Sequence, residues 1–238
     1  MSNWILILLA AALVLSGQQP PSLGCFAGAG GAIVPVWGLA GNLVAGKSWQ
    51  TKGSLLGAYG GLAVVRGAGV VTVLEGDREV ARIPAEEPVA AGFDSGAVVV
   101  LLAGRRAMWI WSGNGEPVET GWHGSGEPLA VTRHLWVERF GAEAWRVGAS
   151  GARVALGTGV TAAALWPDGA VLMVRGARLV FRSPRGEEQD LGDADGETLV
   201  RVGAEWAQSG RYAIHRRAAT AERFLAPEPS MATENDLR

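Results

Sequence analysis

Short apolar runs separated by glycine-bearing turns follow one another along most of this chain. Many of the runs alternate with the two-residue period of a β-strand. In residues 107–111 (AMWIW) the two tryptophans share one face and the methionine and isoleucine share the other, so both faces are apolar. No run within residues 31–217 has the spacing of a helix of three turns. The pattern therefore predicts an all-β protein whose strands are covered on both sides.

The apolar runs repeat as units of four strands. Residues 88–121 and 159–192 share one layout, and Asp94 and Asp168 begin equivalent turns. Both are turn signals, because aspartate bonds to its own backbone and the following glycine accepts a positive φ. The same layout fits residues 54–83, 128–156 and 197–225. Five similar units predict a small β-propeller over residues 31–226, because neighbouring blades of a propeller cover one another.

A segment ahead of the five units is left over. It contains two short strand patterns, at residues 33–37 and 42–45. Five units are few for closing a ring, and an open sheet edge is an aggregation hazard. We therefore expect this segment to pair with the carboxy-terminal unit and close a ring of about five to six four-stranded blades.

Two stretches resemble known propeller sequences. Residues 163–172 (AALWPDGAVL) resemble the turn of PD40 and WD40-like repeats of exported bacterial proteins: Pro167, Asp168 and Gly169 match, and Trp166 stands where serine is usual. Residues 33–41 (IVPVWGLAG) resemble the opening segment of uncharacterised exported propeller-like proteins. The resemblance implies a propeller fold and an extracytoplasmic location, but no reaction, because propellers host many unrelated functions.

The amino terminus carries an unbroken apolar run at residues 4–15. It is shorter than the roughly 20 residues that span a bilayer and has the length of the apolar core of a signal peptide. The three residues before it carry no lysine or arginine, so a buried helix or an uncleaved anchor stays open. We predict a signal peptide over residues 1–17, a linker over 18–30 and a disordered tail over 227–238, in a secreted or periplasmic protein.

The charged residues and the single cysteine limit which partners and modifications are expected. The chain has 21 Lys and Arg against 23 Asp and Glu, with no basic stripe, so no nucleic-acid partner is expected. Cys25 is the only cysteine, which excludes an intrachain disulfide. Residues 22–25 resemble a lipoprotein cleavage site in part, so lipidation of Cys25 is a less favoured route to a membrane.

Residues 41–48 (GNLVAGKS) match the G-x-x-x-x-G-K-S string of a phosphate-binding loop. Such a loop requires a helix directly after it, and the glycines at positions 53, 57, 60 and 61 argue against one here. The match is therefore interpreted as a surface loop carrying Lys47, with no nucleotide bound.

Other motifs are weaker still. Residues 190–197 resemble a calcium loop but lack carboxylates at two required positions, so they are predicted to form an acidic turn between blades. His123, His134 and His215 lack the spacing of a zinc site. Residues 123–126 (HGSG) lack the first glycine of a G-x-S-x-G nucleophile site and are predicted to form a flexible loop. We assign no catalytic, cofactor-binding or metal-binding residue, and the binding residues stay unknown.

The sequence thus favours a non-enzymatic exported binding or scaffold propeller with another protein as its partner, since loops on a rigid ring carry recognition. An exported lectin or hydrolase with its site at the central channel is the alternative. A third possibility is a subunit of a larger cell-surface assembly, in which neighbouring subunits bury exposed tryptophans. Eight of the ten tryptophans, from Trp37 to Trp206 without Trp49, are expected in strands or at strand ends as core.

Overall fold

A computed structural model of the protein describes residues 22–85 and 89–227. In this part of the chain there are 24 strands and one short 3₁₀ helix, η1 (Ala29–Gly31). No helix among these residues is long and apolar enough to cross a membrane. The signal peptide predicted over residues 1–17 and nearly all of the tail predicted over 227–238 lie outside the described residues.

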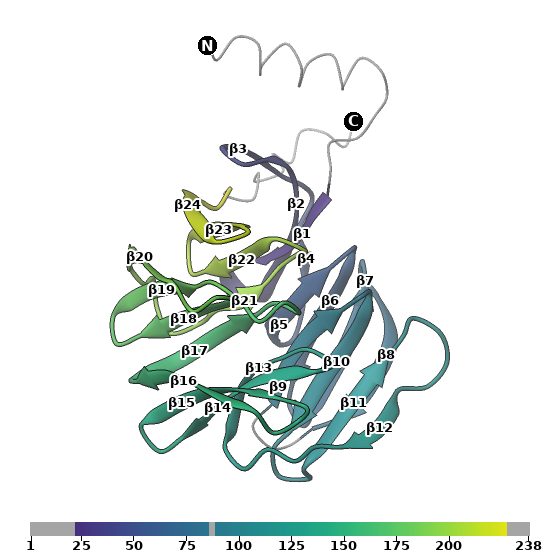
Figure 1. The fold of residues 1–238 in the computed structure, drawn as a ribbon. Coiled ribbons are helices and arrows are strands. Elements are labelled where there is room, and N and C mark those ends of the chain that lie inside the picture. Colours follow the sequence, from purple (N-terminus) through teal and green to yellow (C-terminus); the bar gives the residue numbers. More distant parts are fainter. Residues whose placement is uncertain (1–21, 86–88, 228–238) are drawn as a thin grey trace, which may run out of the picture.

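Five units of four antiparallel strands follow one another along the chain, and in each unit strands adjacent in sequence are adjacent in the sheet (Figure 1). The first is β5 (Ser54–Tyr59), β6 (Leu62–Gly67), β7 (Val70–Glu75) and β8 (Arg78–Pro84). The second is β9 (Val89–Asp94), β10 (Ala97–Leu102), β11 (Ala107–Trp111) and β12 (Val118–Gly121). The third is β13 (Glu127–Val131), β14 (Leu135–Phe140), β15 (Glu143–Gly148) and β16 (Arg153–Thr158). The fourth is β17 (Val160–Leu165), β18 (Val171–Arg175), β19 (Arg178–Arg182) and β20 (Glu188–Asp193). The fifth is β21 (Val200–Arg201), β22 (Trp206–Ser209), β23 (Tyr212–Arg217) and β24 (Thr220–Leu225).

The units form a ring around their first strands. Strands β5, β9, β13, β17 and β21 each contact the next, and β21 also contacts β5. A parallel bridge between Arg201 and Gly57 joins the last unit to the first in one eight-stranded sheet. The prediction of an all-β small propeller is confirmed, and the five predicted units coincide with the five observed ones.

Apolar clusters fill the spaces between consecutive units, as strands covered on both sides require. All six residues of β10 are buried. Trp122 and Trp136 meet edge to face between the second and third units, with ring centroids 6.3 Å apart. The eight tryptophans predicted in strands or at strand ends lie there, and Trp49 also lies in a strand, the two-residue β4 (Trp49–Gln50).

The amino-terminal segment forms a sheet of its own from β1 (Ser22–Ala27), β2 (Ala32–Leu39), β3 (Asn42–Ala45) and β4. This N-terminal sheet fills the space between the fifth and first units, where Phe26 and Ile33 share an apolar cluster with Leu55 and Trp206. The segment was expected to pair with the fifth unit by backbone hydrogen bonds. It packs against that unit instead, while β21 and β5 close the ring beside it.

Close backbone approach explains this packing. A Cβ added at Gly24 would lie 1.8 Å from the Val202 carbonyl oxygen, and one at Gly203 would lie 2.1 Å from that of Leu23. The Gln208 side chain completes the contact, since its amide accepts from Ala27 N at 2.7 Å and donates to Ala27 O at 2.8 Å. The boundary predicted at residue 31 is therefore too late, because β1 belongs to the fold.

Candidate functional site

A central channel of about 280 Å³ lies between the first strands of the five units. Its walls are mostly small residues, such as Ala90–Gly92 on β9 and Ala162–Ala164 on β17. Small side chains at these positions leave room along the axis where five strands converge. At one end the lining includes Ser54, Glu127, Glu197 and Thr198 from the starts of the strands or the turns before them.

Arg201 lies at the other end of the channel. It is 8% exposed and lines the channel. Its Nη1 donates to the carbonyl oxygens of Phe93 at 2.7 Å and Leu165 at 3.4 Å, and its Nε donates to that of Gly203 at 3.2 Å. Arg201 therefore ties the second, fourth and fifth units together at the axis.

The charge of Arg201 has no direct counter-ion in the described part of the chain. No carboxylate there lies within ion-pair distance of it. Burial lowers the pKa of Arg201 to about 10, still well above neutrality, so the guanidinium stays charged. A buried charge without a partner is costly, and such groups are often held for a ligand.

Thr161 supplies a second unsatisfied group along the same wall. Its Oγ1 is buried without a hydrogen-bond partner, and the residue lines the channel. Thr161 and Leu165 lie four residues apart on β17, which corresponds to about 13 Å of extended strand. Thr161 therefore lies toward the end of the channel that bears Ser54 and Glu197, and Arg201 lies toward the other end.

Polar and ring contacts join the turns of the fourth and fifth units. Arg216 lies 2.7 Å from an oxygen of Asp168 and 2.8 Å from one of Glu205. Its guanidinium also stands 5.4 Å from the centre of the Trp166 ring, whose Nε1 donates to Ala204 O at 2.8 Å. The opposite end of the channel is the one that bears Ser54 and Glu197.

A groove of about 610 Å³ adjoins that end. It lies between the N-terminal sheet and the first and fifth units, and it shares Ser54, Leu55, Thr198 and Val200 with the channel. Its other lining residues are mainly glycine, alanine and hydroxyl residues, and Arg211 is its one charged side chain. The groove and the channel are therefore neighbours that share part of one wall.

The residues singled out as a possible phosphate-binding loop form a hairpin. Gly41 occupies the turn with φ 85°, residues 42–45 are strand β3, and β4 follows at Trp49. The anion-binding helix that such a loop needs is replaced by this strand. Lys47 is exposed between β3 and β4, as predicted for a surface loop.

The HGSG stretch was expected to be flexible, and that prediction is wrong. Glu138 is 2% exposed, and its Oε2 accepts from the backbone N–H groups of Ser125 at 3.1 Å and Gly126 at 3.3 Å. The same carboxylate pairs with Arg153 at 3.2 Å. Sequence reasoning missed Glu138, which reads as an ordinary alternating polar residue of β14.

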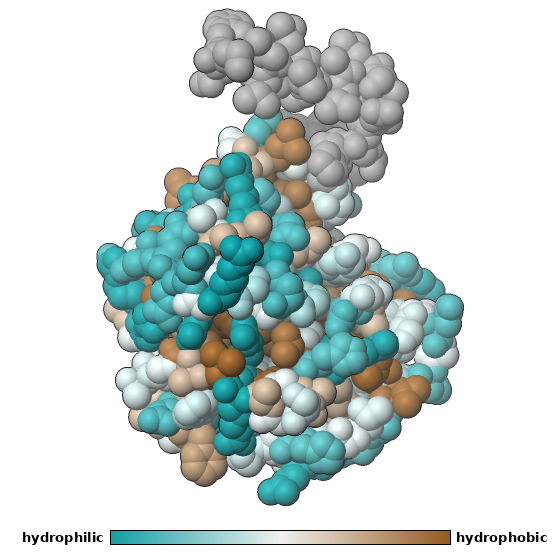
Figure 2. All heavy atoms as spheres, viewed as in Figure 1, coloured by the Kyte–Doolittle hydropathy of each residue, from teal (hydrophilic) through white to brown (hydrophobic). Residues whose placement is uncertain are grey.

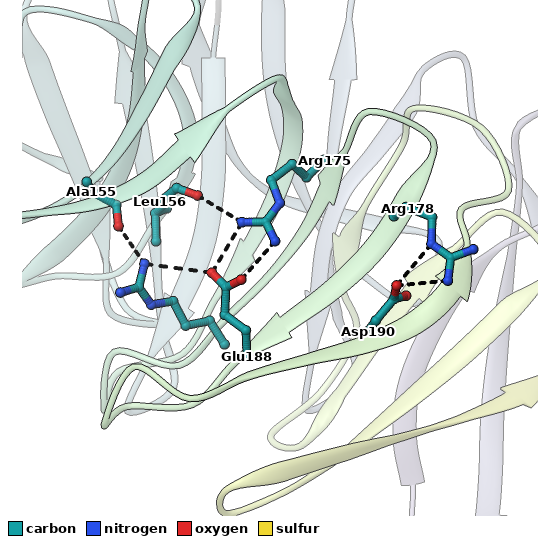
Figure 3. Close-up of polar contacts among 7 residues, drawn as sticks. Ala155, Leu156, Arg175, Arg178, Glu188 and Asp190 are labelled. Atoms are coloured by element: carbon teal, nitrogen blue, oxygen red, sulfur yellow. Dashed lines mark hydrogen bonds and ion pairs between the residues drawn. The ribbon is translucent and has the colours of Figure 1, made fainter.

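The acidic turn predicted at residues 190–197 is held by arginines (Figure 3). Arg178 donates to Asp190 at 2.8 and 3.1 Å and to Asp193 at 2.6 Å, and Asp195 accepts from Arg211 N. These bonds lower the pKa of Asp190. Within residues 22–85 and 89–227, no three metal-binding side chains come together.

A smaller hollow of about 250 Å³ beside β18–β20 is also lined by paired arginines and carboxylates. Arg175 binds Glu188 through two bonds, at 2.8 and 3.2 Å, and donates to Leu156 O (Figure 3). The positive charge of this hollow is therefore already offset by carboxylates, unlike that of Arg201.

No protein-family model and no curated protein matches this chain. Among solved structures, a protein of unknown function from Bacteroides caccae is similar at 12% identity, with a TM-score of 0.52 over 75% of this chain and 78% of that one. A streptogramin B lyase is 13% identical, with a TM-score of 0.47 over 76% of this chain and 72% of the lyase. PorZ of Porphyromonas gingivalis, a bacterial surface component of the type-IX secretion system, is 14% identical with a TM-score of 0.46; the match covers 89% of this chain and 33% of PorZ. At such identities the likeness shows a shared β-propeller fold and nothing of function.

Proposed function

We propose that this chain is an exported, non-enzymatic binding protein of the PD40/WD40-like propeller class that holds an acidic end of a protein partner in its channel. The observation that carries the proposal is Arg201, a buried guanidinium without a carboxylate at the inner end of an accessible hollow. Its Nε and Nη1 are bound to carbonyl oxygens, which leaves Nη2 for a ligand. A carboxylate forms the strongest hydrogen bonds with such a group.

The shape of the hollow favours a peptide. The channel length from Thr161 to Leu165 corresponds to about four residues of extended chain. The adjoining groove would accommodate the residues that lead to this segment. The free carboxy terminus of such a peptide would then meet Arg201.

The lining residues favour binding over catalysis. Neither the channel nor the groove is lined by histidine or cysteine, and the channel carboxylates Glu127 and Glu197 lie at its open end. Glu127 is held by Arg139 at 2.5 Å. A lectin or a hydrolase is the alternative for the same hollow.

The binding proposal is tested with hexapeptide libraries that differ only in a free or an amidated carboxy terminus, and bound peptides are identified by native mass spectrometry. We expect the free-acid library to yield ligands and the amidated one to lose at least about tenfold in affinity, the equivalent of one charge-assisted bond. Arg201→Met should abolish binding, whereas Arg82→Met, which changes an exposed arginine paired with Glu79 outside the channel and the groove, should keep it.

Several results would contradict the proposal. Equal binding of both libraries, or unchanged binding by a folded Arg201→Met variant, would remove the role of the guanidinium. If that variant fails to fold, the comparison of the free-acid and amidated libraries on the wild-type protein still tests the proposal. Cleavage of peptides would favour the hydrolase, and selective binding on a glycan array would favour the lectin.

The proposed class and location rest on two further features. The Pro167-Asp168-Gly169 stretch forms the expected turn, in which Gly169 N donates to Trp166 O at 2.9 Å and Ala170 N donates to Asp168 at 3.2 Å. Export rests on the apolar run at residues 4–15. Sequencing the amino terminus of protein from its native host should find a start close to Gln18, and an intact Met1 in a cytoplasmic fraction would contradict export.

A further inference from the structure

The hairpin of β2 and β3 projects from the ring on the side where the described chain begins (Figure 1). Ser22, the first residue of β1, is paired with Trp37 on β2, and Trp37 is paired with Val44 on β3. The chain therefore enters the fold at the level of the hairpin tip. The preceding sequence carries the apolar run of residues 4–15, joined to β1 by residues 16–21.

The hairpin tip is apolar and exposed. Leu39 is 55% exposed and Val44 is 51% exposed, and Trp37 beside them is half-buried. Figure 2 shows hydrophobic atoms on this projecting end of the molecule. Single exposed apolar residues are common. Two of them on one projecting hairpin, beside a tryptophan, form an apolar patch whose exposure to water is unfavourable.

The hairpin is held in one shape. Gly38 has φ 122°, and a Cβ there would lie 2.1 Å from Asn42 O, so the two strands cross closely. Gly46 N donates to Pro35 O at 2.8 Å, and a Cβ on Gly46 would lie 2.0 Å from the Trp37 ring. The tryptophan ring is thus fixed over Gly46, directly before Lys47.

Charge sets this end of the molecule apart. Lys47 and Lys52 are the only charged side chains before Arg66, and the first acidic residue of the chain is Glu75. The N-terminal sheet is therefore basic and free of carboxylates. Two of the three other exposed large apolar residues in the described part of the chain have acidic neighbours: Val118, 62% exposed, precedes Glu119, and Phe140, 66% exposed, is paired with Glu143. The third, Leu225, is 69% exposed and is paired with Tyr212.

We infer that the β2–β3 hairpin is a membrane-contact element that inserts Leu39 and Val44 into the surface of an anionic bilayer. Apolar side chains at a projecting tip, a tryptophan beside them and a lysine behind them are the composition that binds membrane interfaces. The absence of carboxylates removes the repulsion that anionic headgroups would otherwise exert. This inference is independent of the proposed peptide site.

Co-sedimentation of the full chain with vesicles tests this inference. The vesicles contain phosphatidylcholine alone or with 30 mol% phosphatidylglycerol (roughly a bacterial level of anionic lipid). We expect binding to the anionic vesicles, and Leu39→Ser/Val44→Ser should lower the partition coefficient by about tenfold or more, because two exposed apolar side chains are lost. Val118→Ser/Phe140→Ser is the matched control and should bind like the wild type.

Fluorescence separates the hairpin from the apolar run at residues 4–15, which also carries a tryptophan, Trp4. Brominated lipids should quench wild-type emission more than that of Trp37→Phe, and this difference should vanish in Leu39→Ser/Val44→Ser. Lys47→Glu should weaken binding to anionic vesicles several-fold. If both double variants bind alike, or if Trp37 is not quenched, the hairpin does not contact the bilayer and a protein or the apolar run itself covers it.

Discussion

The junction between the fifth and first units and the junction between the third and fourth are built on different principles. At the first, the N-terminal sheet packs backbone against backbone, with Gly24 and Gly203 in contact with opposing carbonyl groups. At the second, side chains fill the space, including Leu156, Val171 and Met173. At Gly24 and Gly203 the first junction leaves no room for an added atom, whereas the second depends on the side-chain atoms already present. Larger side chains should therefore destabilise the first junction, and smaller ones should destabilise the second.

The largest effect is expected from Gly24→Val. The added Cβ would stand 1.8 Å from the Val202 carbonyl oxygen, and φ at Gly24 is 127°. Relief requires β1 to separate from the fifth unit, so we expect a loss of about 4 kcal/mol or more and of cooperative unfolding. Urea denaturation followed by circular dichroism measures it. Gly121→Val is the control, because nothing lies within 4 Å of a Cβ there; equal effects of the two would refute the distinction.

Leu156→Ala should come next. Leu156 is 1% exposed in the cluster between the third and fourth units, so its truncation leaves a cavity and should cost about 2–5 kcal/mol. Leu225→Ala at a position 69% exposed should stay within about 0.5 kcal/mol. Both are measured by chemical denaturation, and a Leu156→Ala variant as stable as Leu225→Ala would show that this junction tolerates deletion.

Two glutamines allow a closer comparison. Gln208 bonds both backbone groups of Ala27, and Gln189 bonds both backbone groups of Ala221 at 2.9 and 3.0 Å, between the fourth and fifth units. Gln208 is 6% exposed and Gln189 is half-buried. Gln208→Met should therefore lower the free energy of unfolding by about 1–3 kcal/mol. Gln189→Met should lower it less, because water reaches the backbone groups of Ala221 that this variant leaves unpaired. Thermal unfolding measures the loss in each variant. A larger loss in Gln189→Met than in Gln208→Met would contradict the greater dependence of the first junction on its buried hydrogen bonds.

The smallest effect concerns pH. His215 stacks on Trp206 with ring centroids 4.5 Å apart, and burial, with Arg217 nearby, lowers its pKa, against the opposing influence of Glu222 and Glu205. A histidine whose pKa is lowered in the folded state stabilises it above the unfolded pKa of about 6.5, and this is lost as pH falls through the lowered value. The melting temperature should therefore fall between pH 7 and 5.5, and less in His215→Phe. Parallel curves for the two proteins would exclude this histidine as the cause.

The sequence predicted the ring better than the hollow inside it. Alternating runs and glycine turns located the five units to within a few residues, because a strand period and a turn are local properties. The linker predicted at residues 18–30 missed β1, since Gly24 and Gly28 read as flexible when they instead permit close packing. Arg201 could not be identified either, because its three carbonyl partners come from distant parts of the chain.

The bonds between Ala27 and Gln208 join residues 181 positions apart. The N-terminal sheet is made first, yet part of the surface that it covers belongs to the unit made last. Contacts of such separation form late, because the intervening chain must first lose its freedom. A chain that crosses a membrane amino terminus first would therefore carry an uncovered sheet until its carboxy-terminal strands emerge. Folding of this propeller should therefore end when its earliest strands pack against the fifth unit, and the N-terminal sheet is exposed to aggregation until then.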